Sequence, residues 1–437
     1  MYSYSIDVQR TPSADNSLLW HLDYPFKGEI IDSSELIEEG LLVQGWLLSD
    51  SKSPISLVIL NGVKFIELPI SSPRNDVISK VLGDSSENHP QLYCGFSEKV
   101  KLRHPVFSIG VVQDGHFTQL LSGSVEGKFQ VLKGEGDWLF LDNDTNKSVE
   151  QHTGKLKLSR ITQLQWKDYL NSLDRYARSN SMSVCLLIAP SKEMVYEKFY
   201  PHKLSKDSPV NKLAELVPDT LNFVFPVKDL QNLELRSFRV CDTHWTLHGA
   251  KLASQLVTTQ LTAKNLNYLQ VFEGDKYRAR QVSGDLGSKL YPPQFHEEDS
   301  LVSFNYRQKV IFDNNIENFG RVICIFNSEA LIEKSLLLFG SSSSYTMFHY
   351  ISRLYRNVTF VHTAGSIDHE VIEFVKPDHM CLQTNARFVV KAPKFNDSIT
   401  RYIELKKKIG AITAPTIAKA LPEECKTYIE YFIHMLD

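Results

Sequence analysis

The sequence places a carboxylate and an imidazole two residues apart, as Asp242 and His244, directly before a segment with helical apolar spacing. On an extended segment, side chains at positions i and i+2 point to the same side. A carboxylate placed in this way can orient an imidazole that acts as a general base. An Asp-x-His tripeptide also arises by chance, so a solvated loop without chemistry is the alternative interpretation of the pair taken alone.

A second segment offers the nucleophile that the pair lacks. A serine cluster, residues 341–344, follows Gly340 and the apolar run 336–339, and apolar residues at helical spacing come after it. A strand, a tight turn and a helix in this order expose a serine and point backbone N–H groups at an oxyanion. A flexible serine-rich connection is the alternative.

Composition narrows the class of protein. The chain has 437 residues, which predicts two domains, with 42% hydrophobic and 23% charged residues, as in soluble globular proteins. The formal net charge is −3 and no dense basic block occurs, so nucleic-acid binding is not suggested. The short basic run Lys406 to Lys408 is interpreted as a solvated helix face.

The six cysteines are scattered without a Cys-x-x-Cys pair, which favours free thiols in a reducing compartment and no metal site. No segment reaches the roughly 18 apolar residues that a membrane helix needs, and no signal peptide is visible at the start. We therefore expect a cytoplasmic protein without a transmembrane segment. A chain whose signal peptide had been removed would look the same and would work in the periplasm.

The first part of the chain, residues 1–130, is predicted to be an all-β sandwich domain. Between about residues 25 and 130, short β-rich runs alternate with turn residues, and Asn61-Gly62 predicts a hairpin. The predicted strands are 41–48, 55–60, 63–68 and 106–112.

Residues 131–437 are predicted to form an α/β domain with a mostly parallel sheet and a C-terminal helical tail. Short apolar runs alternate with helical periodicity there. The predicted strands include 138–141, 184–188, 221–225, 322–326, 336–339, 358–361 and 379–382. The predicted helices include 161–178, 247–261, 346–355 and 368–375, with Thr246 as an N-cap. The polar, aromatic stretch from about 265 to 320 is interpreted as an insertion that shapes a substrate cleft.

Five motifs in order carry a resemblance to a known family. They lie at residues 134–141 (GEGDWLFL), 188–196 (IAPSKEMVY), 242–250 (DTHWTLHGA), 339–343 (FGSSS) and 376–387 (KPDHMCLQTNAR). Together they resemble the SGNH-hydrolase-like domains of AlgX/AlgJ-type polysaccharide O-acetyltransferases, over roughly residues 130–392. The resemblance implies an SGNH-like three-layer α/β fold.

The resemblance also implies roles for three residues. Ser342 would be the nucleophile, His244 the base and Asp242 the orienting carboxylate. Ser341 stands where the family usually has Asp or Thr, and with four serines in a row Ser341 or Ser343 is an alternative nucleophile. Ala386 stands where the family often has Glu, which would deprive Arg387 of its usual partner.

Five further residues of the matched motifs are candidates for substrate binding: Lys192, Tyr196, Trp245, Ser341 and Arg387. Lys192 and Tyr196 are interpreted as substrate or oxyanion contacts, or else as a helix-start lysine and a core tyrosine. Arg387 would bind an acidic sugar or simply pair with a carboxylate.

The first domain has a weaker resemblance to small sandwich modules attached to bacterial surface-glycan enzymes, carried by Trp46, residues 74–77 and residues 94–96. Such a module would bind or position a glycan, or serve as a structural partner. Trp46 would stack on a sugar or pack inside the sandwich.

These observations predict a serine-dependent O-acetyltransferase acting on a bacterial polysaccharide or glycan precursor. A carbohydrate acetylesterase, in which water takes the acetyl group, and an inactive glycan-binding protein are the alternatives. No bound cofactor is expected. The acetyl donor is not identified, and acetyl-CoA would serve if the protein is cytosolic. The partners expected are the glycan and the donor.

Overall fold

The structure is a computed structural model that describes residues 3–12, 18–50, 53–127, 131–264 and 266–436. The chain divides into two compact units, one of Met1–Gln130 with Gly287–Gln294 and one of Val131–Leu286 with Phe295–Asp437. The expected domain limit at residue 130 adjoins residues 128–130, which lie outside the described residues.

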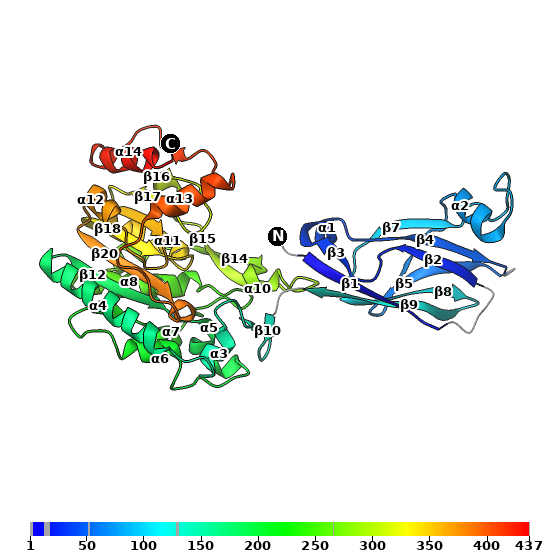
Figure 1. Cartoon of the computed structure of the whole chain (residues 1–437), viewed down its shortest axis with the longest axis horizontal. Coiled ribbons are helices and arrows are strands. Elements are labelled where there is room, and N and C mark those ends of the chain that lie inside the picture. The colour runs from blue at the N-terminus through cyan, green and yellow to red at the C-terminus, as the bar shows by residue number, and fades with distance from the viewer. Residues whose placement is uncertain (1–2, 13–17, 51–52, 128–130, 265, 437) are drawn as a thin grey trace. The chain divides into compact units, whose positions relative to one another are not determined.

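The first unit consists of two antiparallel sheets, one of six strands in the order β3-β1-β9-β8-β5-β6 and one of three in the order β2-β4-β7 (Figure 1). The strands are β1 (Ser3–Arg10), β2 (Leu18–Tyr24), β3 (Glu29–Asp32), β4 (Leu41–Ser49), β5 (Ile55–Asn61), β6 (Lys64–Glu67), β7 (Gly95–Val100), β8 (Val106–Gln113) and β9 (His116–Gly127), with short helices α1 (Ser33–Glu38), α2 (Asn75–Val77) and η1 (Ile78–Leu82). Strands β1 and β2 precede the segment in which the sequence predicts strands.

Alternation along the strands builds the core of this unit. Leu41 and Val43 of β4 are fully buried and face Ile59 and Ile109 of the larger sheet in one cluster. The hairpin at Asn61-Gly62 joins β5 to β6, and Gly62 has φ +66°, a conformation that favours glycine.

The motif residues of the first unit make contacts within it. The Trp46 ring lies 6.3 Å from that of His21 and packs with a small cluster around Cys94. Arg74 donates hydrogen bonds to the carboxylates of Asp76 and Asp23, at 2.8 and 2.9 Å. A role of this unit in glycan binding stays a prediction.

The second unit is built on an eight-stranded mixed sheet in the order β13-β12-β20-β18-β19-β17-β16-β21. The first five strands in this order are parallel, and β17, β16 and β21 add to them as an antiparallel edge. The expectation of a mostly parallel sheet therefore describes only the part that bears the candidate site. The edge is antiparallel because the short link after β17 reverses the chain before β18.

The strands of this sheet are β12 (Ser183–Ala189), β13 (Asn222–Val224), β16 (Val310–Asp313), β17 (Val322–Phe326), β18 (Ile332–Gly340), β19 (Tyr355–His362), β20 (His379–Asn385) and β21 (Thr416–Ile417). Two smaller antiparallel pairs are β10 (Val131–Lys133) with β11 (Leu139–Leu141), and β14 (Tyr277–Val282) with β15 (His296–Leu301).

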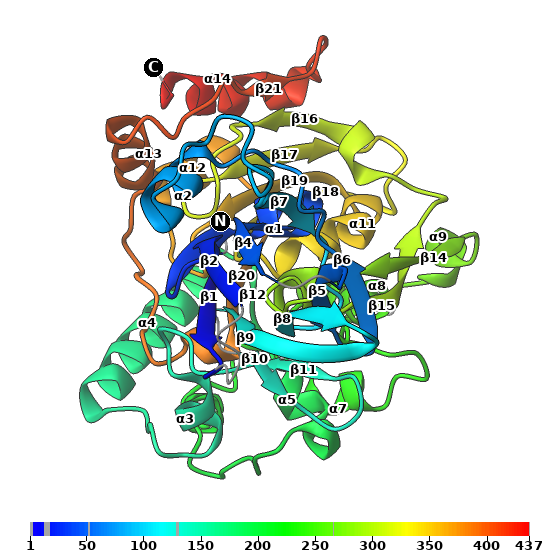
Figure 2. The ribbon, with the colours of Figure 1, turned by 90° about the vertical axis from the view of Figure 1, so that its right-hand side faces the viewer.

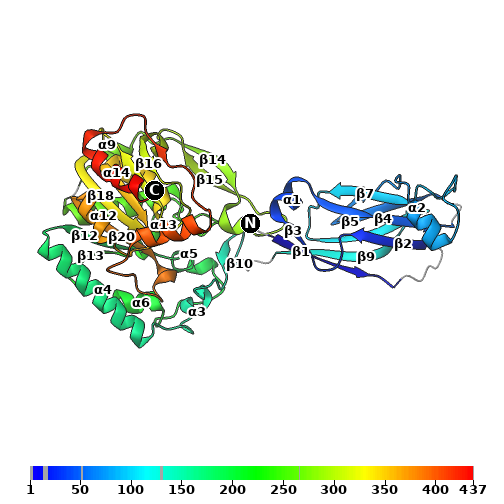
Figure 3. The ribbon, with the colours of Figure 1, turned by 45° about the horizontal axis from the view of Figure 1, so that its top comes forward.

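Helices cover both faces of the sheet and complete three layers (Figures 2 and 3). One face carries α4 (Arg160–Ser179), α6 (Pro209–Ala214), α12 (His369–Val375), α13 (Ile399–Lys408) and α14 (Lys426–His434). The other carries α7 (Val227–Gln231), α8 (Leu247–Thr262), α9 (Leu269–Phe272) and α11 (Ser344–Leu354). The shorter helices are α3 (Ser148–His152), α5 (Lys192–Val195) and α10 (Gly284–Gly287), and single turns lie at η2 (Glu197–Phe199), η3 (Tyr306–Lys309), η4 (Ala386–Phe388) and η5 (Glu423–Cys425).

Local sequence explains where the site-bearing helices begin. Thr246 caps α8, because its hydroxyl accepts a hydrogen bond from the N–H of Gly249 at 3.2 Å. In the sheet, Ala189 pairs with Asn385 and Gly340 pairs with His362. The loops after these parallel strands therefore meet at one edge of the sheet, where α/β enzymes bind their ligands.

The stretch from about 265 to 320 holds α9, the β14–β15 pair, α10 and β16. It is an insertion in part only, because β16 joins the main sheet. Within the described ranges, no helix is both long and apolar enough to cross a membrane.

Candidate active site

Two loops bring the predicted residues to the carboxyl edge of the sheet. Phe238 and Trp245 pair as an isolated antiparallel bridge, so the chain between them folds back as a tight loop that carries Asp242 and His244. Ser342 lies between the end of β18 at Gly340 and the start of α11. This is the strand–turn–helix arrangement that the sequence predicts for the serine cluster.

The three side chains form a continuous hydrogen-bonded chain. His244 Nδ1 lies 2.7 Å from Asp242 Oδ1, and His244 Nε2 lies 3.0 Å from Ser342 Oγ. Asp242 Oδ1 also accepts the backbone N–H of His244 at 2.8 Å. The aspartate is buried, whereas the histidine and the serine are half-buried. With Nδ1–H donating to the carboxylate, Nε2 is left to accept the serine hydroxyl proton.

Asp242 stays ionised in this setting. Burial acts to raise the pKa of its carboxyl. The hydrogen bond from His244 and the charges of His244 and Arg239 outweigh burial and hold that pKa well below its usual range. The guanidinium of Arg239 lies 3.5 Å from Asp242 Oδ2. A permanently charged carboxylate can stabilise an imidazolium that forms during a reaction.

The other three serines of the cluster are held by two amide side chains of β20. Gln383 Oε1 accepts from the N–H and the hydroxyl of Ser341, at 2.7 and 2.9 Å, and from the Ser344 hydroxyl at 2.9 Å. Asn385 Oδ1 accepts from Ser343 Oγ at 2.8 Å. Within the described residues, Ser342 is the member of the cluster whose hydroxyl contacts the histidine.

Donors for a developing negative charge lie beside Ser342. Its own backbone N–H and that of Ser343 make no hydrogen bond among the described residues, at the start of α11. The amide oxygen of Asn385 is occupied by Ser343 and by Gln383 Nε2, at 2.8 and 3.0 Å, so its NH2 group is the part left to donate. Backbone and amide N–H groups of this kind form oxyanion sites.

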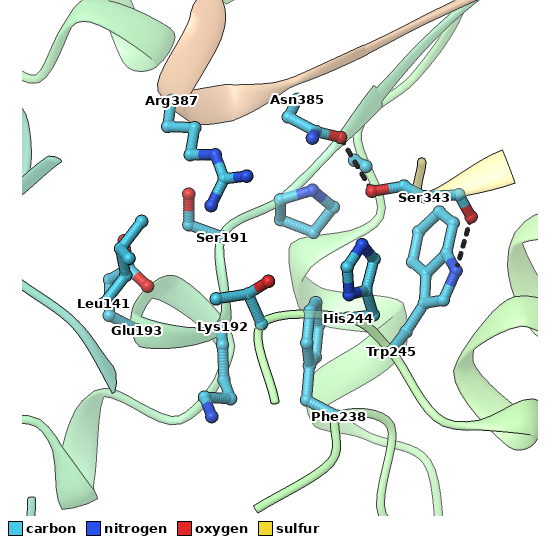
Figure 4. A pocket seen from close by; sticks show the side chains of 13 residues that line it. Leu141, Ser191, Lys192, Glu193, Phe238, His244, Trp245, Ser343, Asn385 and Arg387 are labelled. Atoms are coloured by element: carbon cyan, nitrogen blue, oxygen red, sulfur yellow. Dashed lines mark hydrogen bonds between the residues drawn. The ribbon is translucent and has the colours of Figure 1, made fainter. Parts of the chain in front are cut away.

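A pocket opens next to His244 (Figure 4). Its walls come from the ends of β11 and β12, from the loop between Phe238 and Trp245, and from the segment after β20. Asn385 and Arg387 both line it. We call it the His244 pocket.

The five predicted substrate-binding residues divide into two groups. In four of them, the polar side-chain atoms form hydrogen bonds with other groups of the protein. Lys192 donates to the carbonyls of Arg239, Val240 and Asp242, at 3.1, 3.0 and 2.8 Å. Tyr196 accepts the Ser237 N–H at 2.9 Å, Trp245 donates to the Ser343 carbonyl at 2.9 Å, and Ser341 binds Gln383 as described. Substrate contact by these four stays a prediction.

Arg387 is different, because its guanidinium lines the pocket and its Nε is buried without a hydrogen-bond partner among the described residues. The nearest carboxylate is Asp144, at 3.9 Å. Ala386, the residue before Arg387, offers no carboxylate. The loose pairing leaves Arg387 able to bind an anionic group.

The sequence analysis did not identify the residues that support the site, which are two amides beside the serine turn and one carboxylate beside the His244 loop. Gln383 and Asn385 lie inside a quoted motif, and their spacing of two on a strand could have shown that both point toward the serine turn. Asp285 of α10 gave no signal. Its carboxylate accepts the Thr243 N–H at 2.7 Å and lies 3.7 Å from His244 Nδ1.

Asp242, His244 and Asp285 offer three possible metal-ligand atoms within 4.8 Å of one another. The closest pair, His244 Nδ1 and Asp242 Oδ1, is already joined by a hydrogen bond of 2.7 Å. A metal ion would have to displace that proton. The expectation that no metal is bound stays a prediction.

The solved structures that are similar to this chain include the following three. Bacillus cereus PatB1 is 12% identical over 61% of this chain and 100% of its own, with a TM-score of 0.44. The O-acetyltransferase domain of Pseudomonas putida AlgJ is 13% identical over 61% of this chain and 94% of its own, with a TM-score of 0.35. Pseudomonas aeruginosa AlgX is 11% identical over 60% and 63%, with a TM-score of 0.35.

No protein-family model and no curated protein matches the sequence. The geometry of the site, and not these weak structural likenesses, supports the function proposed for the chain.

Proposed function

We propose that this chain is an SGNH-like, serine-dependent O-acetyltransferase that moves an acetyl group through Ser342 to a hydroxyl of a bacterial polysaccharide or glycan precursor. One observation carries the proposal. Hydrogen bonds join the Ser342 hydroxyl to His244 Nε2 at 3.0 Å and His244 Nδ1 to the Asp242 carboxylate at 2.7 Å. This is the arrangement in which an unreactive hydroxyl becomes a nucleophile.

In the first half-reaction, neutral His244 takes the proton of Ser342 as its oxygen attacks the acetyl carbonyl of the donor. The carbonyl oxygen becomes negatively charged and is stabilised by the Ser342 N–H and the Asn385 amide. The bond to the donor's leaving group then breaks, and the imidazolium returns its proton to that group. Ser342 is left as an acetyl ester, and Asp242 has stabilised the transient positive charge.

In the second half-reaction, a sugar hydroxyl enters the His244 pocket and loses its proton to His244 as it attacks the acetyl-serine. Collapse of the second oxyanion releases the acetylated sugar and restores the Ser342 hydroxyl. Water in place of the sugar would make the protein an acetylesterase. Arg387 would hold an anionic group of the acceptor. The choice of a glycan as acceptor follows the family resemblance.

The test is acetyl release from p-nitrophenyl acetate, with and without an oligosaccharide acceptor, together with mass spectrometry of the protein. We expect an acetyl group on Ser342 and release that is faster with the acceptor. Ser342→Ala should lose at least about a thousandfold in kcat. Ser343→Ala is the matched control and should keep activity within about tenfold, since Asn385 retains its other donors.

The outcomes separate the candidate functions. Release that the acceptor does not change would indicate the acetylesterase. No release, or release equal in wild type and Ser342→Ala, would exclude the acetyl-serine route and leave the glycan-binding alternative. Loss of acetyl release in Ser343→Ala, with full activity in Ser342→Ala, would assign the nucleophile to Ser343 instead.

A further inference from the structure

A second cavity lies at the carboxyl edge of the same sheet, next to the candidate site. Its walls come from residues after β19 and β20 and from the start of α13, and its volume is about 440 Å³. Lys391, Lys394, Arg401, Phe319 and Tyr402 are among the side chains that line it. We call it the Lys391 cavity.

The Lys391 cavity and the His244 pocket share one piece of backbone. Thr384 lines the cavity, and Asn385, the next residue, lines the pocket. On the far side, the N–H groups of Thr363 and Ala364 in the cavity wall donate to the carbonyl of Gly340, at 3.0 and 2.7 Å. Gly340 begins the turn that carries Ser342. Thr384 and Asn385 are consecutive residues of β20, so their side chains point to opposite faces of the sheet, and a chain-like ligand that fills both sites would cross the carboxyl end of this strand.

The charge of the cavity selects anions. Three basic side chains and one carboxylate, Asp397, line it, which leaves a net positive charge. Asp397 is almost fully buried and accepts from Arg401 at 3.1 Å and from the Tyr402 hydroxyl at 2.8 Å, so it fixes these two side chains. Lys391 and Lys394 are exposed, and Lys394 comes only within 3.8 Å of Asp397. Their ammonium groups are free to meet a ligand's anion.

The aromatic side chains of the cavity offer apolar faces against which a sugar ring can pack. Phe319 is 40% exposed, although it is a large apolar residue, and its ring lies 5.4 Å from that of Tyr402. Phe388 adds a third ring to the lining. Apolar faces with a few fixed polar groups are the usual make-up of a ligand site, and the carbon face of a sugar ring packs well on such surfaces.

We infer that the Lys391 cavity binds a negatively charged sugar residue of the acceptor, one or more residues away from the sugar that is acetylated. The inference rests on the proposed function for the idea that the acceptor is a glycan. Carboxylate and phosphate share the chemistry that lysine and arginine recognise, so either a uronic acid or a sugar phosphate supplies the anion.

The test is calorimetric titration of the full chain carrying Ser342→Ala, so that no transfer occurs. The probes are tetragalacturonic acid, mannose 6-phosphate and the neutral maltotetraose. The double change Lys391→Gln with Lys394→Gln removes two cations of the cavity. Its control is Lys408→Gln with Lys419→Gln, two exposed lysines outside the cavity, which changes the net charge equally.

We expect an anionic probe to bind, maltotetraose to bind at least tenfold more weakly, and the cavity variant to lose at least tenfold while the control does not. Binding of tetragalacturonic acid alone assigns a carboxylate, and binding of mannose 6-phosphate alone assigns a phosphate. No binding of either anion, equal binding of maltotetraose, or equal losses in both double variants would overturn the inference. Because no acetyl transfer is measured, its failure is distinct from failure of the proposed reaction.

Discussion

The ammonium group of Lys192 donates a hydrogen bond to the backbone carbonyl of Asp242 at 2.8 Å, while the carboxylate of the same residue orients His244. The other two N–H groups of Lys192 go to the carbonyls of Arg239 and Val240. The side chain is buried, and its three donors are all used on one loop. Lys192 is therefore a positioning residue that holds the Asp242–His244 loop against the end of β12.

Lys192→Met should lower kcat about tenfold to a hundredfold with little change in KM, because three buried carbonyls lose their donor and the loop moves. The midpoint of thermal unfolding should also fall. Steady-state kinetics and calorimetry measure both effects. Lys198→Met, which changes an exposed lysine nearby, is the control and should alter neither. Wild-type kcat in the Lys192→Met protein would show that the loop needs no such support.

The pH dependence offers a second readout on the same lysine. Burial lowers the pKa of Lys192 from its ordinary 10.5 to about 8, although the charges of Asp242 and Asp285 oppose this shift. A neutral amine has only two N–H groups, so one carbonyl loses its donor. We expect kcat to fall as the pH rises through about 8, and Lys192→Met to lack this decline. An identical alkaline decline in both proteins would assign it to another group.

Stability should change in a defined direction with the same ionisation. Between pH 8 and 10.5 the unfolded chain still binds the proton that the folded protein has released. The unfavourable contribution of burying the ammonium is therefore fully present below pH 8 and shrinks as the pH rises. The free energy of unfolding of the wild type, relative to that of Lys192→Met, should rise over this range.

Local patterns in the sequence predict most of the longer strands and helices of the second unit, but not β14, β15, β16 and β21 and not how the elements are arranged. The helices that begin near Arg160 and Leu247 follow from apolar spacing and a polar cap, which are short-range signals. The antiparallel edge formed by β17, β16 and β21 depends on pairings between distant segments, which such signals do not contain. Strand β1 was not predicted from the sequence. Charged and polar residues lie between the apolar residues of its eight positions, so it has no clear apolar run.

The same contrast holds at the site. Asp242 and His244 are close in sequence, so their pairing could be predicted from spacing alone. The contact with Ser342 spans 98 residues and was predicted through the order of motifs. For Lys192 the matched motif leaves two interpretations, a substrate or oxyanion contact and a helix-start lysine. Its three carbonyl partners belong to a loop almost fifty residues later, and only the tertiary structure brings them together.

Gln383 should matter to both folding and activity, because one amide oxygen serves three donors of the serine turn. Gln383→Leu leaves the N–H of Ser341 and the hydroxyl of Ser344 buried without an acceptor, and the Ser341 hydroxyl keeps only Asn385 Oδ1, at 3.2 Å. We expect a loss of about 2–4 kcal/mol in the free energy of unfolding and a large fall in kcat. Denaturant titration and acetyl-release kinetics measure these effects.

Gln383→Glu keeps an oxygen at the same place and should retain more stability than Gln383→Leu. The comparison separates the acceptor role from simple filling of space, since leucine is close to glutamine in size. Equal stability of wild type and Gln383→Leu would mean that water replaces the amide in this turn.

Substitutions of Asp285 distinguish three possible roles of its side chain. Its charge could act on His244, its hydrogen bond could hold the loop that carries His244, or it could bind a metal ion together with Asp242 and His244. Its carboxylate accepts the Thr243 N–H at 2.7 Å and lies 3.7 Å from His244 Nδ1, but the side chain is 36% exposed, so its charge is screened. Asp285→Asn keeps an acceptor for Thr243 and should cost about fivefold or less in kcat. Asp285→Ala also frees the loop and should cost more. A chelator should change neither wild type nor variant, whereas loss of activity on chelation, matched by loss in Asp285→Asn, would show that Asp242, His244 and Asp285 hold a metal.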